Sequence, residues 1–129
     1  MSPAMATSVF KHLRLGTVAD IVLVEIISRD VQGPDRAQEF VAELVAVVNR
    51  ECGKRILVDL RRTIYFSSMG FSALFKLVKC AKEQQRLVKF CNIHPDVRVG
   101  AEVLGLPKVV EIYDCRESAL AAFALTPDD

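Results

Sequence analysis

The sequence has little net charge and no long hydrophobic run. Seventeen lysine and arginine residues oppose sixteen acidic ones, which leaves a net charge of +1 and no broad basic footprint for nucleic acid or a membrane surface. The longest apolar run, DIVLVEII, already contains Glu25 and is far shorter than the roughly 20 residues of a membrane-spanning helix. The first residues, MSPAMATSV, lack the basic start and the apolar core of a secretory signal. We therefore expect a cytoplasmic protein whose partner is neither nucleic acid nor membrane.

The signatures of nucleotide binding and nucleophilic catalysis are also missing. No G-x-G-x-x-G follows a predicted strand, and the sequence has no G-x-S-x-G elbow. The segment GAEVLGLP has two glycines at P-loop spacing, but Leu106 and Pro107 stand where Lys and Ser or Thr are required. The two histidines are a small supply of general bases. We therefore expect neither enzymatic activity nor a bound cofactor.

Cysteine and histidine are sparse, and their spacing does not form a metal site. The four cysteines show no paired spacing, so we interpret them as small hydrophobic residues rather than disulfide partners: Cys52, Cys80, Cys91 and Cys115. Cys91 and His94 supply at most two ligands, whereas zinc needs three or four. His94 is predicted to cap a helix that begins at Pro95. His12 alternates with apolar neighbours in a predicted edge strand and is expected to face water.

What the sequence does contain is an alternating series of strand and helix patterns. With 51% hydrophobic and 26% charged residues, it has the composition of a globular protein. We expect strands over 9–15, 21–27, 55–60, 87–93 and 109–113, and helices over 35–50, 69–84, 95–104 and 115–125. The segment 16–20 is predicted to turn the chain between the first two strands. This order predicts one α/β domain over 9–125, with flexible termini at 1–8 and 126–129. Its sheet is mostly parallel, with an antiparallel hairpin at the N-terminal edge.

Polar residues follow or end two of the strand-like runs. Asp59 ends a central strand, where enzymes of this class often keep functional carboxylates, but we favour a carboxylate that binds loop amides. Ser67 and Ser68 lie between a strand and the helix over 69–84, in the stretch FSSMGFS. Either hydroxyl is a suitable N-cap, and a phosphate at a helix N-terminus is electrostatically favourable. From these residues alone, capping is the preferred interpretation.

The whole series from Phe10 to Phe123 resembles the STAS domain, the fold of bacterial anti-sigma factor antagonists. The resemblance rests on LVDL before the loop, SS-x-G at the helix start, LVKFCNIHPDVRVGAEVLGLPKVVEIYD and the Ala-rich last helix, in this order. It implies a non-enzymatic module that binds an anti-sigma factor or a related kinase-like regulatory protein in a partner-switching pathway. In that family the loop usually reads Asp-Ser-Ser/Thr-Gly. The partner kinase phosphorylates the residue before Gly, and the phosphate blocks binding.

The sequence departs from the family pattern at the acceptor position. With Gly70 matched to the family glycine, Met69 occupies the phosphorylated position and Ser67 the acidic one. Methionine has no hydroxyl, so the module has either lost the switch or uses Ser68 or Ser67 as the acceptor. We favour the first, because a kinase active site is geometrically strict. A second departure is KEQQRL, where such domains often carry Gly at the helix end. Here Gln84 or Gln85 must close the helix.

The resemblance places the partner-binding surface at the loop and helix start, with these residues: Ser67, Ser68, Met69, Gly70, Phe71 and Ser72. We expect the segment SRDVQGPD to join this surface in the fold. Met69 and Phe71 are candidate apolar anchors, and core packing is an equally open interpretation for Phe71. One alternative is a module that senses a small ligand or nucleotide, which predicts a pocket with convergent polar groups beside this helix. Another is a thiol enzyme using Cys91 or Cys115, which predicts an exposed cysteine of low pKa near a base. Self-association stays open.

Overall fold

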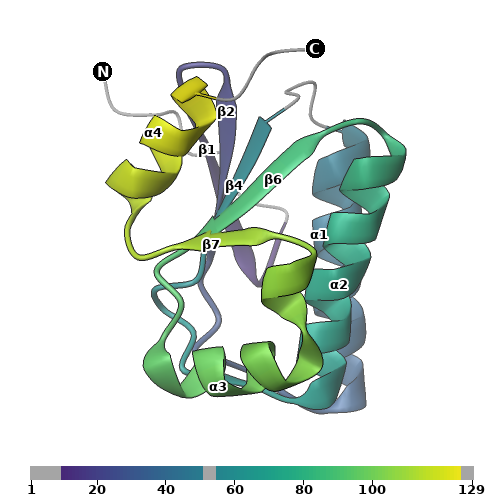
Figure 1. Cartoon of the computed structure of the whole chain (residues 1–129). Coiled ribbons are helices and arrows are strands. Elements are labelled where there is room, and N and C mark those ends of the chain that lie inside the picture. Colours follow the sequence, from purple (N-terminus) through teal and green to yellow (C-terminus); the bar gives the residue numbers. More distant parts are fainter. Residues whose placement is uncertain (1–9, 51–54, 126–129) are drawn as a thin grey trace.

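The computed structural model describes residues 10–50 and 55–125 (Figure 1). The main strands are β1 (Leu13–Val18), β2 (Ile21–Ile26), β4 (Arg55–Asp59), β6 (Leu87–Cys91) and β7 (Glu111–Tyr113). Two shorter strands are β3 (Asp30–Val31) and β5 (Tyr65–Phe66). The helices are α1 (Pro34–Arg50), α2 (Ser68–Glu83), α3 (Pro95–Leu104), the single 3-10 turn η1 (Leu106–Lys108) and α4 (Arg116–Leu125). The predicted termini 1–8 and 126–129, and Cys52, lie outside the described residues.

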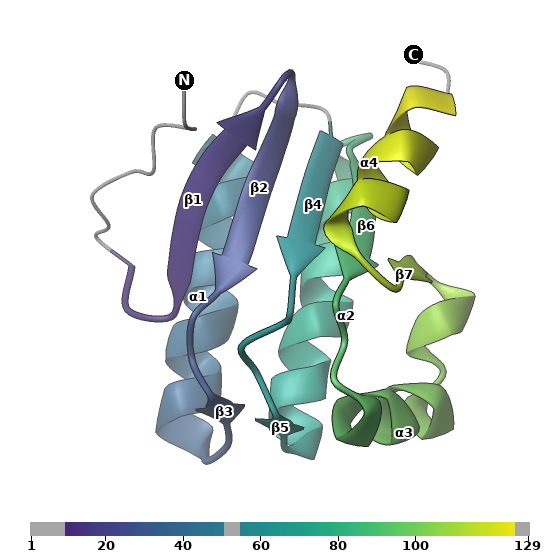
Figure 2. The same ribbon diagram turned by 90° about the vertical axis from the view of Figure 1, so that its left-hand side faces the viewer.

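The five main strands form one sheet in the order β1-β2-β4-β6-β7. β1 and β2 are antiparallel, whereas β2, β4, β6 and β7 pair in parallel. Helices α1 and α2 cover one face and α4 covers the other (Figure 1, Figure 2). The α/β fold predicted from the sequence, with an antiparallel edge hairpin on a mostly parallel sheet, is therefore confirmed.

The sheet is apolar on both faces, as its continuous hydrophobic strands require. In β2, Val22 and Val24 point into the core under α1 and α2, which also contains Phe40 and Leu74. The alternate residue Leu23 joins a smaller core under α4: Ile21, Leu23, Leu57, Cys91, Ala119 and Phe123. Burial on both sides leaves the strand ends and the loops beyond them as the accessible part of this fold.

β3 and β5 form a separate two-stranded sheet that the sequence did not predict. They pair in parallel, with Asp30 opposite Tyr65 and Val31 opposite Phe66. Figure 2 shows this small sheet beyond the carboxyl ends of β2 and β4, next to the first turns of α1 and α2. It therefore fixes the segment before α1 beside the start of α2.

The N-terminal edge differs from the sequence prediction in two respects. The predicted turn 16–20 is wrong in part, because β1 continues to Val18 and only Ala19 and Asp20 turn the chain. His12 does not face water but is 7% exposed. Its Nδ1 lies 2.6 Å from Ser28 Oγ and its Nε2 lies 3.2 Å from Glu39 Oε1. A polar ring is buried here because both its nitrogens have partners.

Helix α2 ends without glycine, as the sequence indicated. Gln85 adopts a left-handed conformation with φ of 59°. The N–H of Gln85 donates to the Lys82 carbonyl (3.0 Å) and that of Arg86 donates to the Ala81 carbonyl (2.8 Å), which is the Schellman arrangement.

We expect Gln85→Gly to stabilise the protein. A non-glycine residue in this conformation costs about 1 kcal/mol, so the substitution should raise the free energy of unfolding by about 0.5–1 kcal/mol. Urea denaturation measures the change. The control Lys82→Gly, in the helical last turn, should lower the same quantity by about 1 kcal/mol. A loss of stability in Gln85→Gly would contradict the strain assigned to this residue.

Candidate partner-binding site

The start of α2 is held in place by Ser67. This residue is the N-cap, and its Oγ accepts a hydrogen bond from the Gly70 amide at 3.2 Å. Its own amide donates to the Val31 carbonyl of β3 at 2.9 Å. Of the two serines, Ser67 is therefore the cap, and its hydroxyl is already engaged by the backbone of the helix.

The other predicted site residues divide into an exposed and a buried group. Ser68 and Ser72 are exposed, and the Ser72 hydroxyl donates to the Ser68 carbonyl at 3.1 Å. Met69 is 49% exposed in the first turn of α2. Gly70 and Phe71 are buried instead. Only the exposed group offers side chains that another protein can touch.

Phe71 belongs to the core rather than to the surface. Its ring centroid lies 5.4 Å from that of Phe66, and its side chain is 5% exposed. Gly100 of α3 lies so close that a Cβ there would be 2.9 Å from the Phe71 ring. Of the two interpretations left open by the sequence, the structure supports core packing, and the candidate apolar anchor that remains is Met69.

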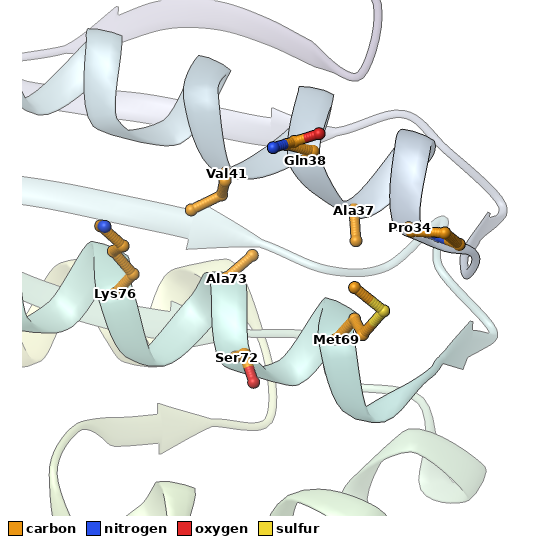
Figure 3. A pocket seen from close by; sticks show the side chains of 8 residues that line it. All are labelled: Pro34, Ala37, Gln38, Val41, Met69, Ser72, Ala73 and Lys76. Carbon is orange, nitrogen blue, oxygen red and sulfur yellow. The ribbon is translucent and has the colours of Figure 1, made fainter.

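A groove lies beside Met69, between the first turns of α1 and α2 (Figure 3). It has a volume of about 400 Å³ and is lined by Pro34, Ala37, Gln38, Val41, Met69, Ser72, Ala73 and Lys76. Figure 3 shows the Met69 side chain pointing across the groove toward Ala37. A pocket beside the helix therefore exists, but its walls are mostly apolar. The convergent polar groups that a nucleotide needs are not provided by Gln38, Ser72 and Lys76 alone.

Further exposed apolar side chains lie at the same end of the molecule. Ile64 (38% exposed) and Tyr65 (50%) immediately precede the site in the chain. On α3, which contacts β5, Val99 and Val103 are 64% and 80% exposed. The sequence analysis did not single out these residues. The signal was available for the valines, because they lie four residues apart, away from the buried pair Val97 and Ala101.

Asp59 has a structural role that links three segments. Its carboxylate is fully buried, and Oδ1 accepts from the Arg61 amide (3.0 Å) and from Asn92 Nδ2 (3.1 Å). Oδ2 accepts from Arg116 Nη2 at 2.7 Å. This hydrogen bond raises the pKa of Arg116. The predicted binding of a loop amide is confirmed, whereas Asn92 and Arg116 were not foreseen.

Cys91 does not provide an activated thiol. Cys91 is buried, and desolvation together with the nearby Asp59 charge raises its pKa to about 12. Its thiol therefore stays protonated at neutral pH, the opposite of what a nucleophile needs. Cys115 is half-buried, and its Sγ lies 3.1 Å from Ser118 Oγ. The alternative of a thiol enzyme at Cys91, which requires an exposed cysteine, is contradicted by this burial.

The described residues hold no cluster of three or more His, Cys, Asp or Glu side chains suited to a metal ion. His94 is instead the N-cap of α3, as predicted, because its Nδ1 accepts from the Asp96 amide at 3.1 Å. Within residues 10–50 and 55–125, none of the helices combines the length and the hydrophobicity needed to span a bilayer.

Comparison with known proteins points to one family. The model of the STAS domain matches residues 35–119. BtrV of Bordetella bronchiseptica, which is named as an anti-sigma factor antagonist, is 32% identical over 87 residues, covering 67% of this chain and 74% of BtrV. An anti-sigma factor antagonist domain from Planctomyces limnophilus superposes with a TM-score of 0.73 at 20% identity, over 85% of this chain and 95% of that one.

The fold is also found in a different functional setting. A sulfate transporter family protein from Wolinella succinogenes superposes with a TM-score of 0.70 at 15% identity, over 84% of this chain and 88% of that one. Structural likeness at such low identity shows the fold and does not choose between the two roles. At 32% identity, the similarity to BtrV shows the family as well as the fold.

Proposed function

The chain belongs to the STAS domain family, and we propose that it is a non-enzymatic module of the anti-sigma factor antagonist type. Its partner is an anti-sigma factor or a related kinase-like regulatory protein, bound through the start of α2. The observation that carries this proposal is the half-exposed Met69, which lies in the first turn of α2 beside an apolar groove. Exposed methionine is typical of protein interfaces. The proposed site of action is the cytoplasm, where the free thiols of Cys80, Cys91 and Cys115 stay reduced.

The second part of the proposal is that the usual phosphoswitch is lost. Met69 has no hydroxyl, and the Ser67 hydroxyl caps α2. Ser68 is exposed, but successive residues of an α-helix point about 100° apart, so its hydroxyl leaves the helix in another direction than the Met69 side chain. A kinase whose active site holds the acceptor hydroxyl at the position of Met69 does not phosphorylate Ser68 unless it binds the module in a different orientation. Binding of the partner is therefore constitutive.

We expect Met69→Ser to restore an acceptor. After incubation with the kinase-like partner and ATP, intact mass spectrometry should show one added phosphoryl group on Met69→Ser and none on the wild type. Met69→Ser combined with Ser68→Ala is the control and should keep the added mass. Addition to the wild type that Ser68→Ala abolishes would overturn the proposed loss of the switch.

Partner binding itself is tested with a charge placed in the groove. Met69→Asp should weaken binding of the partner about 100-fold, because it replaces an apolar anchor by a carboxylate that must be desolvated. Leu87→Asp is the matched control: Leu87 is an exposed apolar residue at the opposite end of the sheet, the first in β6. Isothermal titration calorimetry measures both variants. Equal affinities for Met69→Asp and the wild type would place the interface elsewhere.

A further inference from the structure

The groove beside Met69 has the dimensions of a helix-binding site. Its lining residues span Pro34 to Val41 on α1 and Met69 to Lys76 on α2. Each of these spans is about two helical turns, or about 10 Å along the helix axis. At the other end of the same helix pair, Gln84 Nε2 donates to Asn49 Oδ1 at 2.7 Å and joins their last turns. The groove is therefore confined to the first turns of the two helices, next to the candidate site.

The walls of the groove are mostly apolar. Ala37 and Ala73 are small, buried residues at the contact between the helices, so the space above them is open to another side chain. Val41 adds a half-buried branched side chain. Met69 is long and flexible, which suits a surface that closes on an inserted apolar group. An amphipathic helix inserts apolar residues spaced by one turn into a groove of this kind.

The charge in the lining of the groove is positive, and the acidic residue of α2, Glu83, lies at the far end of that helix. Lys76 is the charged residue of the lining, and Lys79 and Lys82 follow it on the exposed side of α2. None of these three lysines forms an ion pair with another residue in the described part of the chain.

Two of the three acidic residues of α1, Glu39 and Glu43, lie on another side of that helix and are engaged there. The third, Asp35, lines a separate hollow together with Arg36 and Glu39. Glu39 accepts a hydrogen bond from His12 and pairs with Lys11, which lowers the pKa of Glu39. Glu43 accepts from the backbone amides of Lys11 and His12 at 2.7 and 2.9 Å. The positive charge on the α2 side of the groove is thus left for a partner to neutralise.

We propose that the groove binds an acidic amphipathic helix of the protein partner. Two apolar side chains of that helix, spaced by three or four residues, fill the space between Ala37 and Met69. A carboxylate one turn further on pairs with Lys76. This inference rests on the proposed function, since it specifies the chemistry of the partner that binds at the start of α2.

A display library of helical peptides, about four turns long and randomised at every exposed position, tests the proposal on the full chain. Selected peptides should carry apolar residues three or four apart, with Asp or Glu one turn beyond them. Lys76→Glu should weaken their binding about tenfold, and Met69→Asp at least as much. Lys108→Glu is the control of equal charge change, because Lys108 lies beside β7 near Glu111 and Tyr113, and should leave the affinity unchanged. Peptides without acidic enrichment, or with equal affinity for Lys76→Glu, would overturn the proposal.

Two other occupants give distinct results. If analytical ultracentrifugation shows a self-associated species that Met69→Asp disperses, a second copy of the chain fills the groove and the proposal is wrong. If dodecanoate shifts the amide resonances of Ala37, Met69 and Lys76 as strongly as the peptides do, the groove is a site for small amphipathic anions and the proposal is likewise wrong.

The natural partner separates this inference from the function on which it rests. A partner that loses binding to Met69→Asp and keeps full binding to Lys76→Glu leaves the proposed function intact and overturns the acidic helix. If the affinity of the partner is the same for both variants and the wild type, while acidic peptides still bind the groove, the proposed function is overturned instead. Loss of binding to both variants supports the two proposals together.

Discussion

Replacing Gly70 by alanine should lower the free energy of unfolding by about 2 kcal/mol. A Cβ at this position would lie 2.8 Å from the Val31 carbonyl oxygen and 2.8 Å from Phe66 Cδ1. The carbonyl cannot move away freely, because it accepts the hydrogen bond from the Ser67 amide that holds the start of α2 against β3. Alanine gains about 1 kcal/mol in helix propensity over glycine, which offsets only part of the cost of overpacking.

The control for this prediction is a small change in the same turn of α2 that points away from the contact. Ser68→Ala alters an exposed position in the same turn and should change the free energy of unfolding by less than about 0.5 kcal/mol. Gly100→Ala gives an intermediate case, because its added Cβ would meet the end of the Phe71 side chain, 2.9 Å away, rather than a backbone atom. Urea denaturation of the three variants should rank Gly70→Ala as the least stable. Wild-type stability in Gly70→Ala would show that α2 does not approach β3 this closely.

The helices and strands with a clear hydrophobic period were predictable from the sequence, whereas the short strands beside the candidate site, β3 and β5, were not. The stripe containing Phe40 and Leu44 predicted α1, and Pro95 with Gly105 marked the ends of α3, where Gly105 adopts φ of 83°. β3 and β5 have two residues each, which is too short for any hydrophobic period to appear. These strands bring the segment before α1 beside α2, so the groove between the two helices was not foreseeable from the sequence.

Residues that depend on distant partners were also beyond sequence patterns. His12 looked like an exposed strand residue, since its partners Ser28 and Glu39 come from segments 16 and 27 positions further along the chain. Helical spacing allowed Phe71 to face either way, and its contacts with Phe66 and with Gly100 of α3 show that it is buried. The partners of Asp59 lie 33 and 57 residues further on. Local propensity carries no information about such contacts.

The largest loss of stability outside the site is expected for Arg116→Met. The substitution removes the cation that lies 2.7 Å from Asp59 Oδ2 and leaves a carboxylate with no solvent access. A buried charge that loses its partner typically costs 3–5 kcal/mol. The Arg116 side chain is one-third exposed, which lets water approach once it is removed, so we expect about 3 kcal/mol. Urea denaturation at neutral pH measures the loss.

The double variant Asp59→Asn, Arg116→Met separates charge from packing. An asparagine oxygen still accepts from the Arg61 amide and from Asn92, while the buried negative charge is gone. The double variant should therefore regain more than half of the stability lost in Arg116→Met, which is the coupling expected of a direct ion pair. Additive losses in the two single variants would mean that the ion pair contributes nothing beyond the packing of α4.

These variants also separate stability from binding. Arg116 lies on α4, which covers the face of the sheet opposite α1 and α2 (Figure 1). The groove lined by Met69 and Lys76 is formed by α1 and α2 alone. At a temperature where Arg116→Met is still folded, its affinity for the acidic peptides should equal that of the wild type. A parallel loss of affinity would show that the groove depends on the packing of α4 on the other face of the sheet.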